Sequence, residues 1–328
     1  MIFLGIDGGA TNTRAVLISE SGIILSKGTA GPSNYDNVGV ETASNNIAGA
    51  VEQAWTHAGL TPAAADGAFF GMAGVVSEAD RKIILDIAVQ HSIAPPSHIG
   101  IDHDIRIALA GGLAGNEGIV LIAGTGSSCY GRRTDGSNHR TGWGYLLDDL
   151  GSGYFLGLQA MIATIQQADG RGAKTHLSEC VQQRLDYKQI DDIMRILYHQ
   201  HLSVTEIASL APLVLETAQA GDKVARNIIR QGAEELSRMV EAVARKLQFA
   251  ESGCNITYAG GLTQSSFYMQ HIETAIKHRV PKSVLRPPEL PPVIGAAILA
   301  METAHIPLTE KVLANLKSEE RKPEPLQC

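Results

Sequence analysis

The sequence predicts an α/β protein built from two related domains. A short apolar strand at residues 2–7 runs into a glycine- and threonine-rich turn and continues as a second apolar run. A pattern of the same kind starts again at Gly118, and strand-like and helix-like segments alternate after each of these hairpins. The length of 328 residues exceeds that of most single cores, so two domains are expected.

The first third of the chain alternates between strands and helices. Strands are expected at residues 2–7, 14–19, 23–28, 67–72 and 98–101, and helices at 40–57, at about 77–91 and from about 104 to 109. Ser77 to Asp80 has the residue types of a capped helix start, and Ser21-Gly22 is typical of a turn. This order of elements describes a mixed sheet flanked by helices.

The second hairpin begins the same order again. Strands are expected from residue 118, at 129–133, after the Asp135-Gly136 turn and at 255–258, with helices through much of 153–249, at 267–277 and at 308–316. The first domain should cover residues 1–115, joined by a C-terminal helix at about 306–328, and the second should cover 116–305. The polar, proline-bearing residues 317–328 are expected to be loose.

The bulk composition excludes several classes of partner. A formal net charge of −7 without a basic cluster argues against nucleic acid and anionic membranes. The first apolar run has no basic lead and soon meets Asp7, unlike a signal peptide, and the apolar segment 293–300 is too short to cross a bilayer. The four cysteines, Cys129, Cys180, Cys254 and Cys328, are scattered, as in proteins of a reducing compartment. A soluble cytoplasmic protein is expected.

Both hairpin tips have the residue types that hold a polyphosphate such as that of ATP. Glycines let backbone N–H groups approach phosphate oxygens, and hydroxyl side chains add donors without bulk. The expected ATP-binding residues are Gly8, Gly9, Thr11, Asn12 and Thr13 in the first hairpin, and Gly124, Thr125, Gly126 and Ser127 in the second. Mg²⁺ prefers carboxylate and water oxygens, so Asp7 is the expected metal partner, through water. An ordinary tight turn is the alternative for each tip.

Several ordered blocks together resemble the sugar-kinase/actin/heat-shock-chaperone superfamily. They are the first hairpin, Asn34, Asp104, the Gly124 hairpin with its Trp143 extension, Gly260-Gly261 and the segment 292–297. Within the superfamily, the chain is most similar to the N-acetylglucosamine kinase branch of the BadF/BadG-type ATPase family. The resemblance covers nearly the whole chain. It implies two ribonuclease-H-like domains with an interdomain ATP- and sugar-binding cleft.

The resemblance also implies a reaction. ATP would donate its γ-phosphate, with Mg²⁺ as second cofactor, to a hydroxyl of N-acetylglucosamine or a related hexosamine or hexose, with the 6-hydroxyl as the expected acceptor. Such a transfer needs a base for the attacking hydroxyl. Asp104 stands directly before a predicted helix and matches the family's catalytic Asp better than Asp102 does. A plain helix cap is the alternative for Asp104. His103 is interpreted as a surface or supporting histidine.

The small-molecule sugar is expected to meet three segments. Asn34 lies in the loop 31–35 and can both donate to and accept from hydroxyls. Trp143 and Gly144 form the second segment, and Asp149, which matches the family's sugar-binding Asp, belongs to the third. Trp143 could also be a core aromatic and Asp149 a helix cap. Gly260-Gly261 resembles the adenosine-side turn.

The resemblance leaves the exact sugar open, because Leu150 stands where the family usually has Glu after its sugar-binding Asp. Two further classes of function remain. An ATPase that activates a partner enzyme, of the dehydratase-activator type, would bind an iron–sulfur cluster through cysteines, and the scattered cysteines lack such an arrangement. A sugar-sensing regulator would need a DNA-binding module before the ATP-binding strand. Relatives are often dimers, so a homodimer is one expected state.

Overall fold

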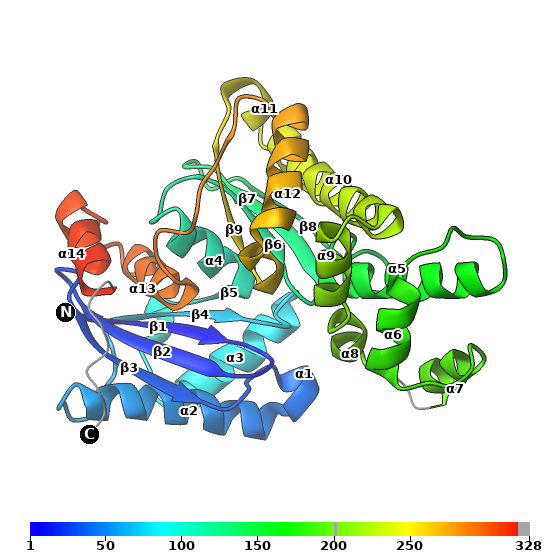
Figure 1. The fold of residues 1–328 in the computed structure, drawn as a ribbon. Helices are drawn as coiled ribbons and strands as arrows, with labels where there is room; N and C mark the ends of the chain where they lie inside the picture. The colour runs from blue at the N-terminus through cyan, green and yellow to red at the C-terminus, as the bar shows by residue number, and fades with distance from the viewer. Residues whose placement is uncertain (200–201, 321–328) are drawn as a thin grey trace. The chain divides into compact units, whose positions relative to one another are not determined.

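The computed structural model describes residues 1–199 and 202–320, and it divides into two compact units (Figure 1). The first unit comprises Met1–Glu117 together with the chain from Pro287 onward, and the second comprises Gly118–Arg286. The chain therefore returns to the first unit at Pro287. The sequence had instead placed residues up to 305 in the second domain.

The first unit is built on a five-stranded mixed sheet with the order β3-β2-β1-β4-β5. The strands β1 (Ile2–Gly8), β2 (Thr13–Ser19) and β3 (Ile24–Ala30) are antiparallel neighbours, whereas β4 (Gly67–Met72) and β5 (Ile99–His103) run parallel to β1. All five strands were predicted, and β3 continues two residues beyond its predicted end. The β1–β2 hairpin pairs Gly8 with Thr13, so its tip spans residues 9–12.

Helices cover both faces of this sheet (Figure 1). One face packs against α2 (Val40–His57) and α3 (Glu78–Gln90), and the other against α4 (Asp104–Gly112), α13 (Pro292–Thr303) and α14 (Glu310–Glu320). The short helices α1 (Tyr35–Val38) and η1 (Pro96–His98) complete the unit. The helix α14 continues to Glu320, past the predicted start of a loose tail at residue 317. The rest of that predicted tail lies outside the described residues.

Close helix packing explains why α13 belongs to the first unit. This helix is apolar on all sides, and nine consecutive residues from Val293 to Met301 are buried. A Cβ atom at Gly295 would overlap the backbone of Ile107 and Gly111 in α4, and one at Gly5 would overlap α13 itself. Glycine at these positions therefore lets α13 lie directly against both β1 and α4. This contact holds α4, and Asp104 at its start, in place on the sheet.

The second unit has the same type of sheet, with the order β10-β9-β6-β7-β8. The strands β6 (Gly118–Ala123), β7 (Ser127–Arg132) and β8 (Asn138–Thr141) form an antiparallel meander, while β9 (Asn255–Ala259) and the short β10 (Val284–Leu285) are parallel to β6. The sequence did not predict β10. The two mixed sheets with their helices confirm the predicted α/β fold class.

The helical stretch of the second unit is a series of separate helices. They are α5 (Gly153–Ala168), α6 (Leu177–Leu185), α7 (Asp192–Tyr198), α8 (Val204–Ala208), α9 (Ala211–Gln219), α10 (Lys223–Lys246) and α11 (Phe249–Ser252), followed after β9 by η2 (Gly261–Gln264) and α12 (Ser266–Arg279). Within 1–199 and 202–320, no helix has the length and apolar character needed to cross a membrane.

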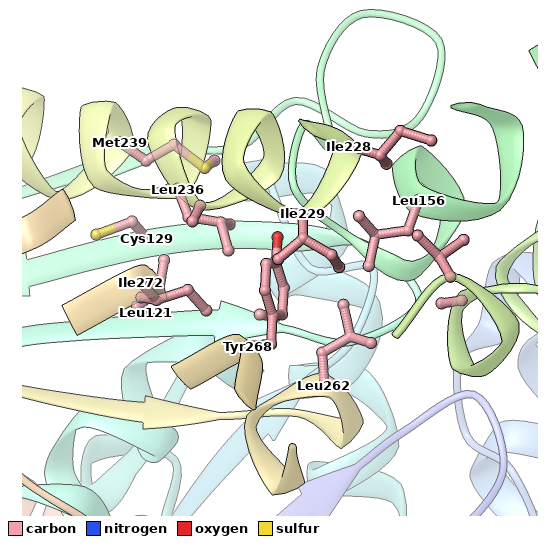
Figure 2. Close-up of a cluster of buried hydrophobic side chains, with 14 of the residues drawn as sticks. Leu121, Cys129, Leu156, Ile228, Ile229, Leu236, Met239, Leu262, Tyr268 and Ile272 are labelled. Carbon is pink, nitrogen blue, oxygen red and sulfur yellow. The ribbon is translucent and has the colours of Figure 1, made fainter. Parts of the chain in front are cut away.

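The core of the second unit reaches the loop before α5. Figure 2 shows Tyr268 among apolar side chains from the sheet, α5 and α10. Tyr268 is fully buried, and its hydroxyl donates a 2.8 Å hydrogen bond to the carbonyl oxygen of Gly151. A buried tyrosine needs such a partner, since an unpaired hydroxyl in the core is costly. The bond fixes Gly151, and with it the neighbouring Asp149, to the core.

Candidate active site

The tip of the first hairpin presents polar groups to solvent. The backbone N–H of Gly9 donates to the carbonyl of Asn12 over 2.9 Å, which closes the turn. Thr11 and Asn12 are exposed, as donors for a phosphate must be. Thr13 is different, because its side chain is fully buried and its hydroxyl donates to the carbonyl of Gly31 over 2.7 Å. The Thr13 hydroxyl thus ties β2 to the start of the Asn34 loop.

Backbone hydrogen bonds fix the Asn34 loop to the hairpin. The carbonyl of Gly9 accepts from the N–H groups of Ser33 and Asn34 over 3.1 and 3.3 Å. The side-chain oxygen of Asn34 caps α1 by accepting from the N–H of Asp36 over 3.2 Å. The predicted sugar-binding Asn34 is therefore held beside the predicted phosphate-binding tip.

The structure adds Gly74 to this region, which the sequence analysis missed. Gly74 lies in the loop after β4 with a φ of +93°, and a Cβ there would lie 3.0 Å from the side-chain oxygen of Asn34. The preceding Ala73 donates its N–H to the carbonyl of Gly8 over 2.8 Å. The one available signal was a glycine directly after a buried strand, in Met72-Ala73-Gly74.

The carboxyl ends of three parallel strands meet at one edge of the first sheet. In register across the strands, Asp7 of β1 pairs with Gly71 of β4, and Gly71 pairs with Asp102 of β5. Neighbouring strands are about 4.8 Å apart, so this edge brings the end of β1 within roughly 10 Å of the end of β5. Open α/β sheets bind ligands at such edges.

Two carboxyl groups at this edge influence each other. The pKa of Asp7 is raised from its ordinary 3.8 to about 6, first by burial and second by the negative charge of Asp104, while the nearby Arg14 opposes the rise. The Arg14 guanidinium lies 3.9 Å from the Asp7 carboxylate. A half-buried carboxylate that is repelled by a second carboxylate is suited to binding Mg²⁺, since the cation would relieve the repulsion.

Asp102 and Asp104 differ in their hydrogen-bond partners. Asp102 accepts from the guanidinium groups of Arg106 over 2.9 Å and Arg81 over 3.2 Å, and from the backbone N–H of His103 over 2.9 Å. Burial alone would raise the pKa of Asp102, but the hydrogen bonds from Arg106 and His103 and the charges of both arginines lower it below the usual value. The Asp102 carboxylate is thus already engaged by two arginines and a backbone N–H.

Asp104 is the more accessible carboxylate. It is the first residue of α4, where the helix dipole favours a negative charge, and its side chain is 34% exposed. The cap position of α4 belongs to His103, whose ring nitrogen faces the N–H of Ile105 over 3.3 Å. Asp104 therefore does not occupy the cap position of α4. The Nδ1 atom of His103 lies 2.6 Å from its Oδ1 atom.

In the second unit, the second hairpin and Asp149 form one hydrogen-bonded group. The backbone N–H of Ser127 donates to Oδ1 of Asp149, and the Ser127 hydroxyl donates to the carbonyl of Leu150, each over 3.0 Å. Gly126 lies against the same carboxylate, because a Cβ at this position would be 2.7 Å from its Oδ2 atom. Thr125 is the exposed residue of the tip. The carbonyls of Gly124 and Thr125 accept from the start of α5.

Burial raises the pKa of Asp149, the hydrogen bond from Ser127 opposes this, and the charge of Asp148 adds to the rise. Asp149 is not the cap of α5, since Ser152 takes that position. Trp143 is 65% exposed, so it is not a core aromatic. The guanidinium of Arg140 lies 5.3 Å from the centre of its ring, and Gly144 follows it with a φ of +81°.

The Gly260-Gly261 turn lies beside the second hairpin. β9 and β6 are parallel neighbours. Gly260 follows β9 with a φ of +104°, and it lies so close to the end of β6 that a Cβ atom would overlap the carbonyl of Ala123. A Cβ at Gly261 would meet no atom within 4 Å, so open space lies next to this turn. A flat group such as a nucleoside could lie against backbone of this kind.

Comparison with known proteins places the chain in a family. The sequence model of the BadF/BadG/BcrA/BcrD ATPase family matches residues 4–300. The chain belongs to this ATPase family. The match includes both hairpins, Asp104, Asp149 and the return of the chain to the first unit through α13.

Individual proteins resemble the chain over most of their length. An N-acetylmuramic acid/N-acetylglucosamine kinase of Clostridium acetobutylicum is 32% identical over 81% of this chain and 87% of its own. An N-acetyl-D-glucosamine kinase of Dictyostelium discoideum is 29% identical over 92% and 98%. The crystal structure of a candidate N-acetylglucosamine kinase from Chromobacterium violaceum superposes with a TM-score of 0.72 at 27% identity, covering 91% of this chain and 98% of that one.

Proposed function

We propose that this protein is an ATP-dependent kinase that transfers the γ-phosphate of ATP to the 6-hydroxyl of N-acetylglucosamine or a closely related hexosamine. The relatives named above that share 29–32% of its residues are kinases of N-acetylated amino sugars. The structural observation that carries the proposal is the accessible Asp104 carboxylate, held at the same sheet edge as Asp7. A base next to a phosphate-binding hairpin is what transfer to an alcohol requires.

In the proposed mechanism, Asp104 accepts the proton of the sugar hydroxyl. The sugar oxygen forms a bond to the γ-phosphorus while the bond from that phosphorus to the bridging oxygen of ADP breaks. Protein groups in such a transfer mainly position the reactants and stabilise charge. The tip of the first hairpin, with Thr11 and Asn12 exposed, donates to phosphate oxygens. Asn34, fixed to that tip, binds sugar hydroxyls.

The second unit supplies the remaining groups in this proposal. Thr125, with the amides of its hairpin, binds phosphate, Asp149 binds a sugar hydroxyl, and the Trp143-Gly144 segment contacts the ring. Gly260 and Gly261 contact the adenosine. Asp7 would hold Mg²⁺ through water, and that ion would supply charge neutralisation at the phosphates. The proposal includes action in the cytoplasm without nucleic-acid or membrane partners, and a homodimer as one state to be tested by light scattering.

A substrate panel tests the proposed function. The purified protein would be assayed with MgATP and glucose, glucosamine, N-acetylglucosamine, N-acetylmannosamine or N-acetylmuramic acid, with ADP formation coupled to NADH oxidation. We expect the highest kcat/KM with N-acetylglucosamine, and a phosphorus-coupled NMR signal at carbon 6 of the product. The matched control is Asp104→Asn, which should bind ATP without turnover. The proposal would be refuted if none of the five sugars were phosphorylated.

A further inference from the structure

We propose that His103 is a positioning residue for Asp104, and that its Nδ1–H group donates a hydrogen bond to the Asp104 carboxylate. The inference rests on the proposed function, in which Asp104 is the base. His103 is the last residue of β5, and Asp104 is the first residue of α4. The Nδ1 and Oδ1 atoms lie 2.6 Å apart, within hydrogen-bond reach and slightly below the roughly 2.7–2.9 Å of charge-assisted N–H···O bonds.

A hydrogen bond to Asp102 fixes the backbone of His103. Its N–H donates to Oδ1 of Asp102 over 2.9 Å. Asp102 is itself held from α3 by Arg81 and from α4 by Arg106. Two arginines from helices on opposite faces of the sheet thus converge on the residue before His103. With its backbone held this way, the imidazole can hold one oxygen of Asp104 and leave the other oxygen to face a sugar hydroxyl.

The same ring nitrogen has a second candidate partner, and the two are chemically exclusive. As the cap of α4, Nδ1 would accept a hydrogen bond from the N–H of Ile105, over 3.3 Å. As a partner of Asp104, Nδ1 must carry a proton and donate it, over 2.6 Å. A neutral imidazole protonated at Nδ1 cannot accept there, and one protonated at Nε2 cannot donate there. The contact with the Asp104 carboxylate is the shorter of the two and involves a charged acceptor, so it favours the Nδ1–H tautomer.

Three substitutions separate positioning from capping. His103→Asn is able to fill either role, because the Asn side chain caps helices and its amide donates to carboxylates. His103→Asp is able to fill only the cap role, since an ionised carboxylate donates nothing and repels Asp104. His103→Ala fills neither role. If His103 positions Asp104, the Asn variant keeps kcat within about fivefold, while the Asp and Ala variants lose about 10- to 100-fold in kcat with little change in the KM for ATP or sugar.

Thermal unfolding reports the cap. Because an imidazole protonated at Nδ1 does not cap α4, the Ala variant should melt near the wild-type temperature. A clearly lower melting temperature of the Ala variant, restored in both the Asn and Asp variants, would show that His103 caps the helix and would overturn the proposal. An Asp variant that is as active as the Asn variant would overturn the proposal and leave His103 as a helix cap. The proposed function is tested separately, by whether the wild-type protein phosphorylates a sugar. Failure of the His103 proposal can therefore be distinguished from failure of the proposed function.

A measurement without turnover tests the tautomer directly. The imidazole of His103 would be observed by ¹⁵N NMR, assigned by its absence in His103→Asn, at a pH where the shifts show a neutral ring. The proposal requires the proton on Nδ1 in the wild type, and a shift of the tautomer population toward Nε2–H in Asp104→Ala, where the acceptor is gone. Observation of the Nε2–H tautomer in the wild type would overturn the inference whatever the activity data show.

Discussion

The Oδ1 atom of Asp149 accepts a 3.0 Å hydrogen bond from the backbone N–H of Ser127, so the predicted sugar-binding residue also shapes the predicted phosphate-binding hairpin of the second unit. Asp149 is almost fully buried and has a φ of +57°, in the left-handed region that Asn and Asp tolerate better than most residues. The hydroxyl of Ser127 is also engaged, by the carbonyl of Leu150. Thr125 is therefore the exposed hydroxyl of this tip.

Substitutions of Asp149 should separate these two roles. Asp149→Asn keeps an oxygen acceptor for the Ser127 N–H and tolerates the left-handed backbone, so its stability should stay within about 1 kcal/mol of wild type while the KM for sugar rises. Asp149→Ala leaves a buried N–H unpaired and strains the backbone, which should cost about 2–4 kcal/mol. Urea unfolding and sugar kinetics check both. Equal stability of the two variants would contradict the structural role.

Replacing Asp7 should stabilise the protein in a pH-dependent way. The pKa of Asp7 is raised from 3.8 to about 6 in the folded protein. At neutral pH, ionisation of Asp7 therefore destabilises the folded state relative to the unfolded chain. Asp7→Asn should increase the free energy of unfolding by about 1–3 kcal/mol above pH 6. The gain should shrink as the pH falls from 6 to 3.8 and vanish below that, where Asp7 is protonated in both states.

Unfolding of wild type and Asp7→Asn in urea at several pH values between 3.5 and 8 (about half-unit steps) measures this difference. Turnover should be lost in Asp7→Asn, because the proposed Mg²⁺ partner is gone. A stability difference that does not change with pH would show that Asp7 ionises as freely in the folded protein as in the unfolded chain.

Asp104→Asn should lower kcat by about 10²- to 10⁴-fold, the usual contribution of a general base. ATP affinity should change little, since the proposed phosphate contacts remain. The same substitution removes a negative charge that raises the pKa of Asp7, so the Asp7 carboxyl should titrate at a lower pH in this variant. Carbon-13 NMR of the carboxyl groups measures that shift.

Asp102→Asn is the matched comparison for Asp104→Asn. This variant leaves Arg81 and Arg106 without their shared carboxylate, so it should lower the free energy of unfolding by about 1–3 kcal/mol, which Asp104→Asn should not. A near-wild-type rate in Asp104→Asn would remove Asp104 from the mechanism.

Packing between α4 and α13 should be sensitive to a single methyl group. Gly295→Ala would force Ile107 and Gly111 away from α13, which should cost about 1–3 kcal/mol and lower kcat, because α4 carries Asp104. Gly49→Ala is the matched control. Gly49 is exposed in the middle of α2, its added Cβ would contact only the Cβ of Ala30 at 4.0 Å, and alanine should stabilise the helix by about 0.5–1 kcal/mol. Destabilisation by both variants alike would contradict the close-packing account.

Local sequence patterns predicted most of the elements that build the candidate site. The β1–β2 and β6–β7 hairpins, β4, β5 and the start of α4 all follow from apolar runs bounded by glycine, threonine or a capping residue. The boundary after Arg286 could not be predicted this way. A uniformly apolar segment such as Val293 to Met301 is buried in whichever unit it joins, and its partner is decided by shape, here by glycines in β1, α4 and α13.

By itself, the sequence determined the two α/β units and their two hairpins, because each depends on residues adjacent in the chain. The choice of Asp104 over Asp102 as the base stays a prediction. Tertiary structure alone decided which polar groups are already engaged. Thr13 and Ser127 have the residue types of phosphate ligands, yet their hydroxyls donate to Gly31 and Leu150. The contact of His103 with Asp104 and of Asp149 with Ser127 is likewise decided there. Hydrogen-bond partners depend on distances and directions in the folded chain, and a linear pattern of residue types does not contain them.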